Sequence, residues 1–191
     1  QLLIMLIFAS MATATHQLGL HSATASAGAS GLADKMATLG AFLLGFYTSL
    51  TVSRWWRLRT DGVGNIWSSC SQLQMFISQF VTKDEQVLTS IRRYARASLT
   101  MIFMKRHYGA AKFPKKLKEL VDNNILTVEE VEKLKGWNNN LAESIWTWVA
   151  HIVASQHKAG NIKSEQMLTY LMEKVNLGRS GAALIGAQMG T

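Results

Sequence analysis

The sequence has little of the chemistry that disulfide-bonded, metal-binding or catalytic proteins need. Cys70 is its only cysteine, which excludes an intrachain disulfide and a cysteine-rich metal site. We expect an ordinary buried or half-buried thiol there. The sequence contains no phosphate-binding glycine loop, no His-Glu-x-x-His motif and no nucleophile elbow. Since nothing in it supports catalysis, we expect a protein that is not an enzyme.

Strand patterning is also lacking. No alternation of apolar and polar residues persists anywhere, and no internal repeat of useful length occurs. Apolar residues instead recur at spacings of three and four, which predicts α-helices. Hydrophobic residues make up 48% of the sequence, close to the value of ordinary globular proteins. The sequence therefore predicts an all-α fold, and its composition alone would not reveal a membrane protein.

One stretch lacks charge altogether, and it organises the chain. Residues 36–53 contain no Asp, Glu, Lys or Arg, and a membrane-spanning helix needs about 20 mostly apolar residues. The stretch is followed by Arg54, Trp55 and Trp56, and aromatic rings beside positive charges are typical of the cytoplasmic membrane surface. We therefore expect a spanning helix over residues 36–56. The alternative is a buried helix of a soluble protein.

The residues before this helix suggest an earlier spanning segment. Residues 1–14 are apolar but short, and they fit part of a first spanning helix or the core of a signal peptide. Residues 15–30 are rich in Ala, Ser, Gly and Thr, and we expect a loop there. His16 and His21 in this loop could bind a metal or sense pH, but loop histidines more commonly do neither. Both chain ends lie within apolar runs, so we expect a fragment of a longer protein.

Positive charge follows the uncharged stretch. The net charge of the chain is +8, and residues 54–135 hold 15 Lys/Arg and 8 Asp/Glu, which gives +7. Because this excess begins where the spanning helix ends, we expect residues 54–160 inside and residues 15–35 outside the membrane. The basic stretch Lys112–Lys118 is either a contact with anionic lipid or a solvated helix face.

The next part of the chain is expected to be helical with short interruptions. Asp61 and Gly62 predict a turn over residues 60–64, and a helix should follow over residues 65–81. A longer helix should begin with a capping box, in which Thr82 and Glu85 satisfy each other's free backbone amides. Gly109 should end that helix.

Three further helices are expected beyond the only proline, Pro114. The first should begin with a capping box of Thr127 and Glu130 and end at Gly136. The aromatic segment 137–160 has a helical apolar stripe, whose simplest interpretation is packing. An amphipathic helix over residues 164–177 should end at Gly178. Residues 180–191 carry a small residue at every fourth position, which is typical of closely packed membrane helices.

Three residues of the uncharged stretch form the candidate site. Thr38, Phe42 and Phe46 are four residues apart and therefore stack on one face of a helix. A phenyl ring has a positive edge and a negative face. From the residues alone, packing of these rings against other helices or lipid explains the pattern at least as well as a binding or pore-lining role does.

The same stretch resembles a known family. Residues 44–56 read Leu-Gly-Phe-Tyr-Thr-Ser-Leu-Thr-Val-Ser-Arg-Trp-Trp. This is similar to the Leu-Gly-Phe-Tyr-Val-x-Leu-Val-Val-x-Arg-Trp-Trp signature of the bestrophins. The resemblance continues downstream and runs over nearly the whole chain. The residues that carry it are Gly45, Tyr47, Arg54, Trp55 and Trp56, then Lys83-Asp84-Glu85-Gln86, Arg93-Tyr94-Ala95 and Leu126–Glu130.

The resemblance implies a subunit of a pentameric channel that passes chloride, with bicarbonate as a second candidate ion. It implies that Thr38, Phe42 and Phe46 line the neck of the pore, although Thr38 replaces the usual bulky aliphatic residue. In such a neck, positive ring edges turned inward by several subunits would tolerate anions without holding them, as conduction requires. Bestrophins are commonly gated by calcium through an acidic cluster, which would lie outside this chain, so no metal site is expected within it. The implied partners are membrane lipid and identical subunits, and the plasma membrane is favoured over a thylakoid or other organelle membrane.

We therefore expect an all-α, bestrophin-like membrane protein in three parts. A helix hairpin over residues 1–56 would include the pore-lining helix 36–56, residues 57–179 would form a mainly cytoplasmic helical region, and residues 180–191 would begin a further membrane helix. Two other functions stay open. A membrane-anchored basic interaction protein would have no pore. A soluble basic helical module would bind nucleic acid, but the sequence has no base-reading motif and we expect no nucleic-acid partner.

Overall fold

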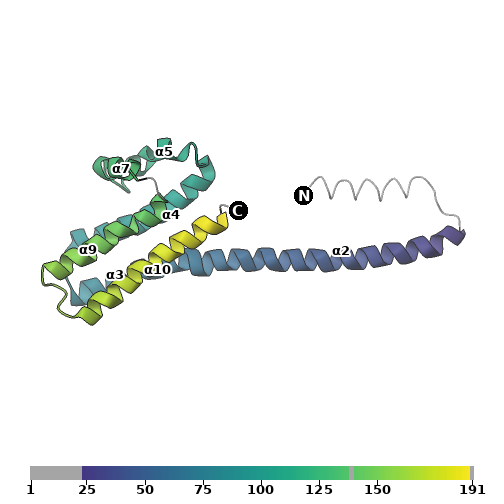
Figure 1. Ribbon diagram of the computed structural model, residues 1–191, viewed down its shortest axis with the longest axis horizontal. Helices are drawn as coiled ribbons and strands as arrows, with labels where there is room; N and C mark the ends of the chain where they lie inside the picture. The colour runs from purple at the N-terminus through teal and green to yellow at the C-terminus, as the bar shows by residue number, and fades with distance from the viewer. Residues whose placement is uncertain (1–22, 138–139, 190–191) are drawn as a thin grey trace. The chain divides into compact units, whose positions relative to one another are not determined.

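The computed structural model describes the backbone of residues 23–137 and 140–189, and the side chains of residues 31–137 and 140–188. Helices are the only regular structure among these residues (Figure 1), which confirms the predicted all-α class. The chain divides into two compact units, residues 1–53 and residues 54–191. We describe each unit by itself.

The described part of unit 1 is a single helix, α2 (Ala23–Arg57), whose last turn belongs to unit 2. Every side chain from residue 31 to residue 57 is exposed. The predicted loop over residues 15–30 is wrong where it can be compared, because residues 23–30 are helical. Four of those eight residues are alanine, the strongest helix former, and none is proline. Residues 1–14 and both loop histidines lie outside the described residues.

Unit 2 begins without the predicted turn. The helix passes from α2 into a short π-helical segment, η1 (Leu58–Val63), and then into α3 (Gly64–Phe80). The N–H of Gly64 donates to the carbonyl of Arg59, five residues back, as a π-helix requires. Asp61 and Gly62 were therefore misread as a turn. Gly62 is needed for a different reason, which is the close approach of another helix.

The next helix, α4 (Glu85–Tyr108), has a different cap from the predicted one. The carboxylate of Asp84 accepts a hydrogen bond from the N–H of Gln86 at 2.9 Å, so Asp84 is the N-cap residue. The hydroxyl of Thr82 accepts a hydrogen bond from the N–H of Asp84 at 3.1 Å and shapes the turn before the helix. The predicted end is confirmed, since Gly109 follows the helix with a φ of 77° that favours glycine.

Three short helices follow: α5 (Phe113–Lys116), α6 (Lys118–Asp122) and α7 (Val128–Lys135). The capping box that begins α7 is confirmed. The N–H of Glu130 donates to the hydroxyl of Thr127 at 3.2 Å, and the N–H of Thr127 donates to the Glu130 carboxylate at 2.7 Å. Gly136 ends this helix, as predicted.

The last helices are α8 (Leu141–Ser144), α9 (Trp146–Lys158) and α10 (Glu165–Met189). The predicted end at Gly178 is wrong, because α10 runs through this position without interruption. A side chain at Gly178 would collide with the indole of Trp146. The glycine is therefore present so that a buried tryptophan can pack against the backbone of α10.

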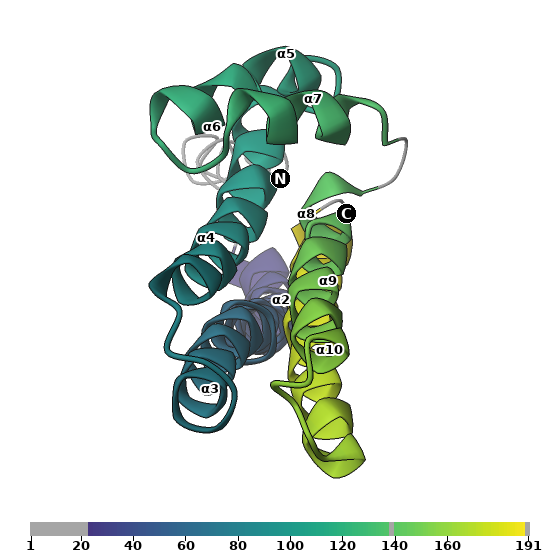
Figure 2. The ribbon, with the colours of Figure 1, turned by 90° about the vertical axis from the view of Figure 1, so that its left-hand side faces the viewer.

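The core of unit 2 lies between two layers, with α3 and α4 on one side and α9 and α10 on the other (Figure 2). The two buried polar side chains among the described residues are Ser69 and Ser98. Ser69 in α3 donates to the carbonyl of Lys174 in α10 at 2.5 Å, and Ser98 in α4 donates to the carbonyl of Ala142 in α8 at 2.6 Å. The largest fully buried side chains are Trp146, Leu73, Ile77, Ile91, Met101, Leu117, Leu120, Leu134, Ile145, Leu171, Ile185 and Val149.

Candidate functional site

The candidate face of α2 has the aligned geometry that the spacing predicts, and its side chains are uncovered. Phe42 is 69% exposed and Phe46 is 57% exposed. The hydroxyl of Thr38 donates to the carbonyl of Asp34 at 2.8 Å, within the same helix. The remaining faces of α2 are equally open, as Leu39 and Leu43 show with 54% exposure each. The single chain therefore aligns the three residues without distinguishing their face from the others.

The polar side chains of α2 are suited to an apolar environment. The hydroxyls of Thr48 and Thr51 each donate to the carbonyl four residues earlier, at 2.8 Å. A threonine that satisfies its hydroxyl within its own helix leaves no donor facing lipid. The helical run Gly31–Phe80 includes an 18-residue window with a mean hydropathy of 1.4, none of it buried. By length and composition this run could cross a membrane.

The base of α2 carries the signature residues. The guanidinium of Arg54 donates to the carbonyl of Gln188 in α10, so it fastens two parts of unit 2. Trp55 and Trp56 are both about half exposed, with ring centroids 6.3 Å apart, and the guanidinium of Arg59 lies 5.7 Å from the Trp55 ring centroid. An exposed pair of indoles with cations beside them is suited to a membrane surface.

A close contact between two glycines packs α10 against η1. A Cβ atom built on Gly181 would lie 2.6 Å from the carbonyl oxygen of Gly62, and one built on Gly62 would lie 2.5 Å from Cγ1 of Ile185. The two backbones therefore approach more closely than any side chain allows. Sequence reasoning missed this contact because a glycine in a helical pattern is easily read as a break. The available signal was the presence of three glycines, Gly178, Gly181 and Gly186, within one otherwise helical stretch that has no proline.

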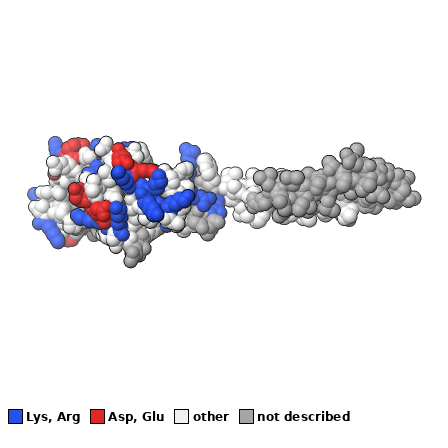
Figure 3. All heavy atoms as spheres, turned by 90° about the horizontal axis from the view of Figure 1, so that it is seen from above, with Lys and Arg blue, Asp and Glu red and all other residues white. Residues whose placement is uncertain are grey.

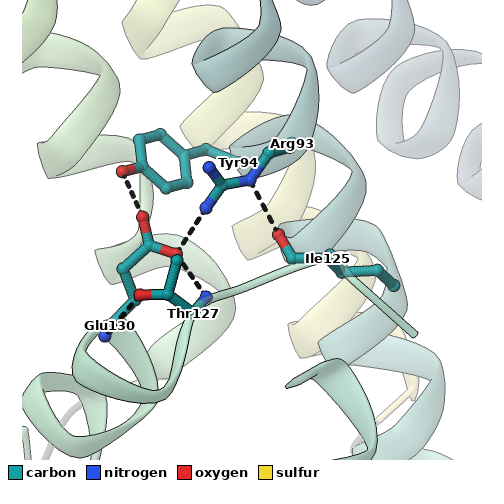
Figure 4. A network of polar contacts seen from close by, with 5 residues as sticks. All are labelled: Arg93, Tyr94, Ile125, Thr127 and Glu130. Atoms are coloured by element: carbon teal, nitrogen blue, oxygen red, sulfur yellow. Dashed lines mark hydrogen bonds and ion pairs between the residues drawn. The ribbon is translucent and has the colours of Figure 1, made fainter. Parts of the chain in front are cut away.

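A polar network links α4 to the beginning of α7 (Figure 4). The Arg93 guanidinium donates to the Glu130 carboxylate at 2.5 Å and to the carbonyl of Ile125 at 3.2 Å. The Tyr94 hydroxyl donates to the other oxygen of Glu130 at 2.7 Å. The same carboxylate accepts the N–H of Thr127, so one side chain caps α7 and anchors it.

The network changes the chemistry of its tyrosine. Burial, and after it the hydrogen bond to Glu130, raises the pKa of Tyr94 to about 12. The Tyr94 ring also packs edge-on against Trp148, with ring centroids 5.3 Å apart. This contact agrees with the prediction that the aromatic stripe of residues 137–160 serves packing. Arg93 and Tyr94, two of the residues on which the family resemblance rests, thus stabilise the fold.

Comparison with known proteins decides the family. A family model described as "Bestrophin, RFP-TM, chloride channel" matches residues 2–187. The chain belongs to the bestrophin family. It is therefore a membrane protein from a family of channels and not of enzymes, which confirms the predicted fold class and the expectation that it is not an enzyme.

Individual bestrophins resemble the chain at lower identity. Bestrophin-1 of Sus scrofa is 31% identical over 150 residues, and Bestrophin-1 of Homo sapiens is 27% identical over 146 residues; each match covers 73% of this chain and 24% of the relative. Bestrophin-2 of Mus musculus is 24% identical over 155 residues, which cover 75% of this chain and 28% of the relative. The chain thus spans about a quarter of the length of the curated relatives it matches.

The bestrophin chain provides no metal centre within its described residues. No group of three or more His, Cys, Asp or Glu side chains comes together there in a way that could hold an ion. Cys70 is half-buried, and burial raises the pKa of its thiol, an effect that Arg92 partly offsets. The thiol is therefore mostly neutral at physiological pH, as expected for a packing residue.

Proposed function

We propose that this chain is part of a subunit of a chloride-conducting bestrophin channel, with Thr38, Phe42 and Phe46 lining the neck of its pore. The observation that carries the proposal is the uncharged helix over residues 36–53, fully exposed, with two aligned phenylalanines, in a member of a channel family. A helix with so much uncovered apolar surface needs partners from lipid or from other chains. In the proposed channel, identical subunits around an axis cover one side of the helix, and lipid or neighbouring helices cover the rest.

The phenyl rings give the proposed neck its chemistry. Around a symmetry axis, each phenylalanine becomes a ring of identical residues. Positive ring edges turned inward attract anions weakly, so an ion enters and leaves easily. The apolar surface also resists wetting, which lets a small change in width close the pore. Chloride is the proposed permeant ion, with bicarbonate as a second one.

The assembly and placement follow from the same proposal. We propose a homopentamer in the plasma membrane, with residues 15–35 outside and residues 54–160 on the cytoplasmic side, where the basic excess lies. In this arrangement residues 1–56 form the membrane hairpin, residues 57–179 the cytoplasmic helical region, and residues 180–191 lead towards the membrane again. Calcium regulation, if the whole channel has it, uses a site outside residues 1–191.

Bilayer currents of the purified full-length channel test the neck. Replacing Phe42 and Phe46 together by Ala widens the constriction and removes its barrier to wetting, so currents should persist and depend less on the gating stimulus. Selectivity should change less than gating, because ring edges attract anions only weakly. Leu43→Ala is the matched control, since Leu43 points about 100° away from Phe42 on the same helix. It should change packing and leave gating as it was.

Two results would contradict the proposal. Unchanged gating in the double variant, together with altered assembly, would make the rings packing residues. A mass in detergent below that of five subunits would exclude the pentamer. A monomeric mass would favour the remaining alternative, a membrane-anchored basic interaction protein without a pore.

A further inference from the structure

One end of unit 2 collects positive charge around a hollow in its surface. The hollow lies between the end of α4, the residues that follow it and the C-terminal part of α10, and its lining includes Lys105, Arg106, Asn140 and Gly186. Lys112 is close to this lining, because its N–H donates to the carbonyl of Gly109 at 3.2 Å, and Gly109 lines the hollow. Two cationic side chains, Lys105 and Arg106, therefore line the concave site, and the backbone of Lys112 lies beside it.

The stretch of chain that forms this end contains many basic residues and no acidic ones. Residues 105–118 contain six Lys/Arg and no Asp or Glu. Lys116 is paired with Glu119 at 3.0 Å. Lys105 and Lys112 are exposed, and no ion pair found in the described part of the chain involves either of them. Lys105 in the lining and Lys112 near it in the chain are thus available to an anion from outside.

The hollow lies at the end of unit 2 that contains Arg54, the first residue of that unit. Gly186 precedes Gln188 by two residues, which is about 3 Å along a helix, and the carbonyl of Gln188 accepts the hydrogen bond from Arg54. Arg54 directly follows the uncharged residues 36–53. In the proposed topology, on which this step rests, Arg54 lies at the membrane surface, and its hydrogen bond to Gln188 keeps this end of unit 2 near that surface. Figure 3 shows Lys and Arg side chains over both ends of unit 2, with the larger group on the side of its junction with α2.

We propose that this basic end of unit 2 binds the phosphate-bearing headgroups of anionic phospholipids. Each Lys or Arg near an anionic leaflet adds a similar increment of attraction, and several together make a lipid contact. The hollow gives the headgroup a concave seat between α4 and α10.

The test uses the full-length protein in neutral detergent and water-soluble dioctanoyl lipids. Dioctanoyl phosphatidylinositol bisphosphate should bind and raise the melting temperature, whereas dioctanoyl phosphatidylcholine should do neither. The variant Lys105→Gln/Lys112→Gln should bind the anionic lipid on the order of tenfold more weakly or worse. Raising the salt concentration should weaken binding to the wild type, because surface charges are screened.

The matched control removes the same charge at the other end of unit 2. Lys83 precedes α4 and Lys163 precedes α10, so each lies at the opposite end of its helix from the hollow, and both are exposed. Lys83→Gln/Lys163→Gln should bind the lipid within about twofold of the wild type, because screened charges at that distance contribute little. Both double variants remove exposed side chains only, so both should fold.

Three outcomes would overturn the proposal. The first is equal binding by Lys105→Gln/Lys112→Gln and the wild type. The second is an equal loss in both double variants, which would mean diffuse attraction and no site. The third is competition by inorganic phosphate at the lipid's own concentration, which would assign the hollow to free phosphate. Binding is measured without any current, so a failure of the proposed pore would leave this result unaffected.

Discussion

The two units place apolar side chains in opposite situations. Phe46 in the helix of unit 1 is 57% exposed, whereas Trp146 in unit 2 is 1% exposed. Both belong to helices rich in apolar residues, so hydrophobicity alone does not decide which side chain is covered. Unit 2 covers its aromatic residues with its own helices, and α2 has no partner helix among the described residues of unit 1. Among the described residues its surface is therefore uncovered.

The glycines repeat this contrast. A Cβ atom built on Gly45 would meet nothing within 4 Å, whereas one built on Gly181 would meet the carbonyl of Gly62 at 2.6 Å. In unit 2 the missing side chain allows two backbones to touch. In α2 the missing side chain makes the helix surface narrower, and no neighbour among the described residues packs into the space. The glycines of α2 therefore serve no contact within the described part of the chain.

The largest expected effect comes from removing the buried tryptophan. Trp146→Ala should destabilise unit 2 by about 3–5 kcal/mol, because it deletes a large core side chain and leaves a cavity. It also removes the hydrogen bond in which the indole N–H donates to Ser98 at 3.1 Å. Thermal or denaturant unfolding of the full-length protein in detergent measures the change.

Two other aromatic substitutions sharpen this result. Trp67 is 76% exposed in the same unit, so Trp67→Ala should cost well under 1 kcal/mol. Phe46→Ala should leave the unfolding of unit 2 unchanged and act on subunit assembly or gating. If Trp67→Ala destabilised unit 2 as strongly as Trp146→Ala, the contrast between covered and uncovered side chains would be lost.

A smaller effect is expected at the glycine contact. Gly181→Ala should destabilise unit 2 by about 1–3 kcal/mol, since the new methyl group has no room and the helices must separate. Gly45→Ala is the control in α2, and alanine is a better helix former than glycine, so it should not destabilise the helix of the single chain. A stable Gly181→Ala variant would show that η1 and α10 can move apart without cost.

The smallest expected effect is the pH dependence of Tyr94. Its pKa is about 12 in the folded protein, against about 10 for an unperturbed tyrosine. The folded state thus favours the protonated phenol. This contribution to stability is complete below about pH 10 and is lost as the pH rises through about 12. Tyr94→Phe removes it, so the gap in melting temperature between wild type and variant should narrow above about pH 10. A constant gap would contradict the assigned pKa.

Much of the helical framework could be predicted from short-range patterns. The capping box of Thr127 and Glu130 uses residues three apart, and Gly109 ends a helix through its own backbone preference, so both signals are local. The alignment of Phe42 with Phe46 follows from helical spacing alone. These features need no knowledge of what lies elsewhere in the chain.

The errors arose where a distant residue decides the structure. Gly62 and Gly178 were predicted to interrupt helices, because glycine is a weak helix former. Their surroundings, Ile185 in one case and Trp146 in the other, lie more than 30 residues away in sequence. Thr82 was predicted as the N-cap of α4, but Asp84 is the N-cap. Both residue types cap helices well, and only the backbone geometry selects between them. The role of the candidate neck depends on other subunits and stays a prediction.

The network around Glu130 restricts how this sequence can change over time. Its carboxylate accepts hydrogen bonds from Arg93, Tyr94 and the N–H of Thr127. Losing any one partner leaves half-buried charge or polar groups without a match, so single exchanges are penalised more than coordinated ones. A lineage that replaced this network would have to pass through less stable intermediates or change several positions together. We therefore expect Arg93, Tyr94 and the capping residues of α7 to change together and not one at a time.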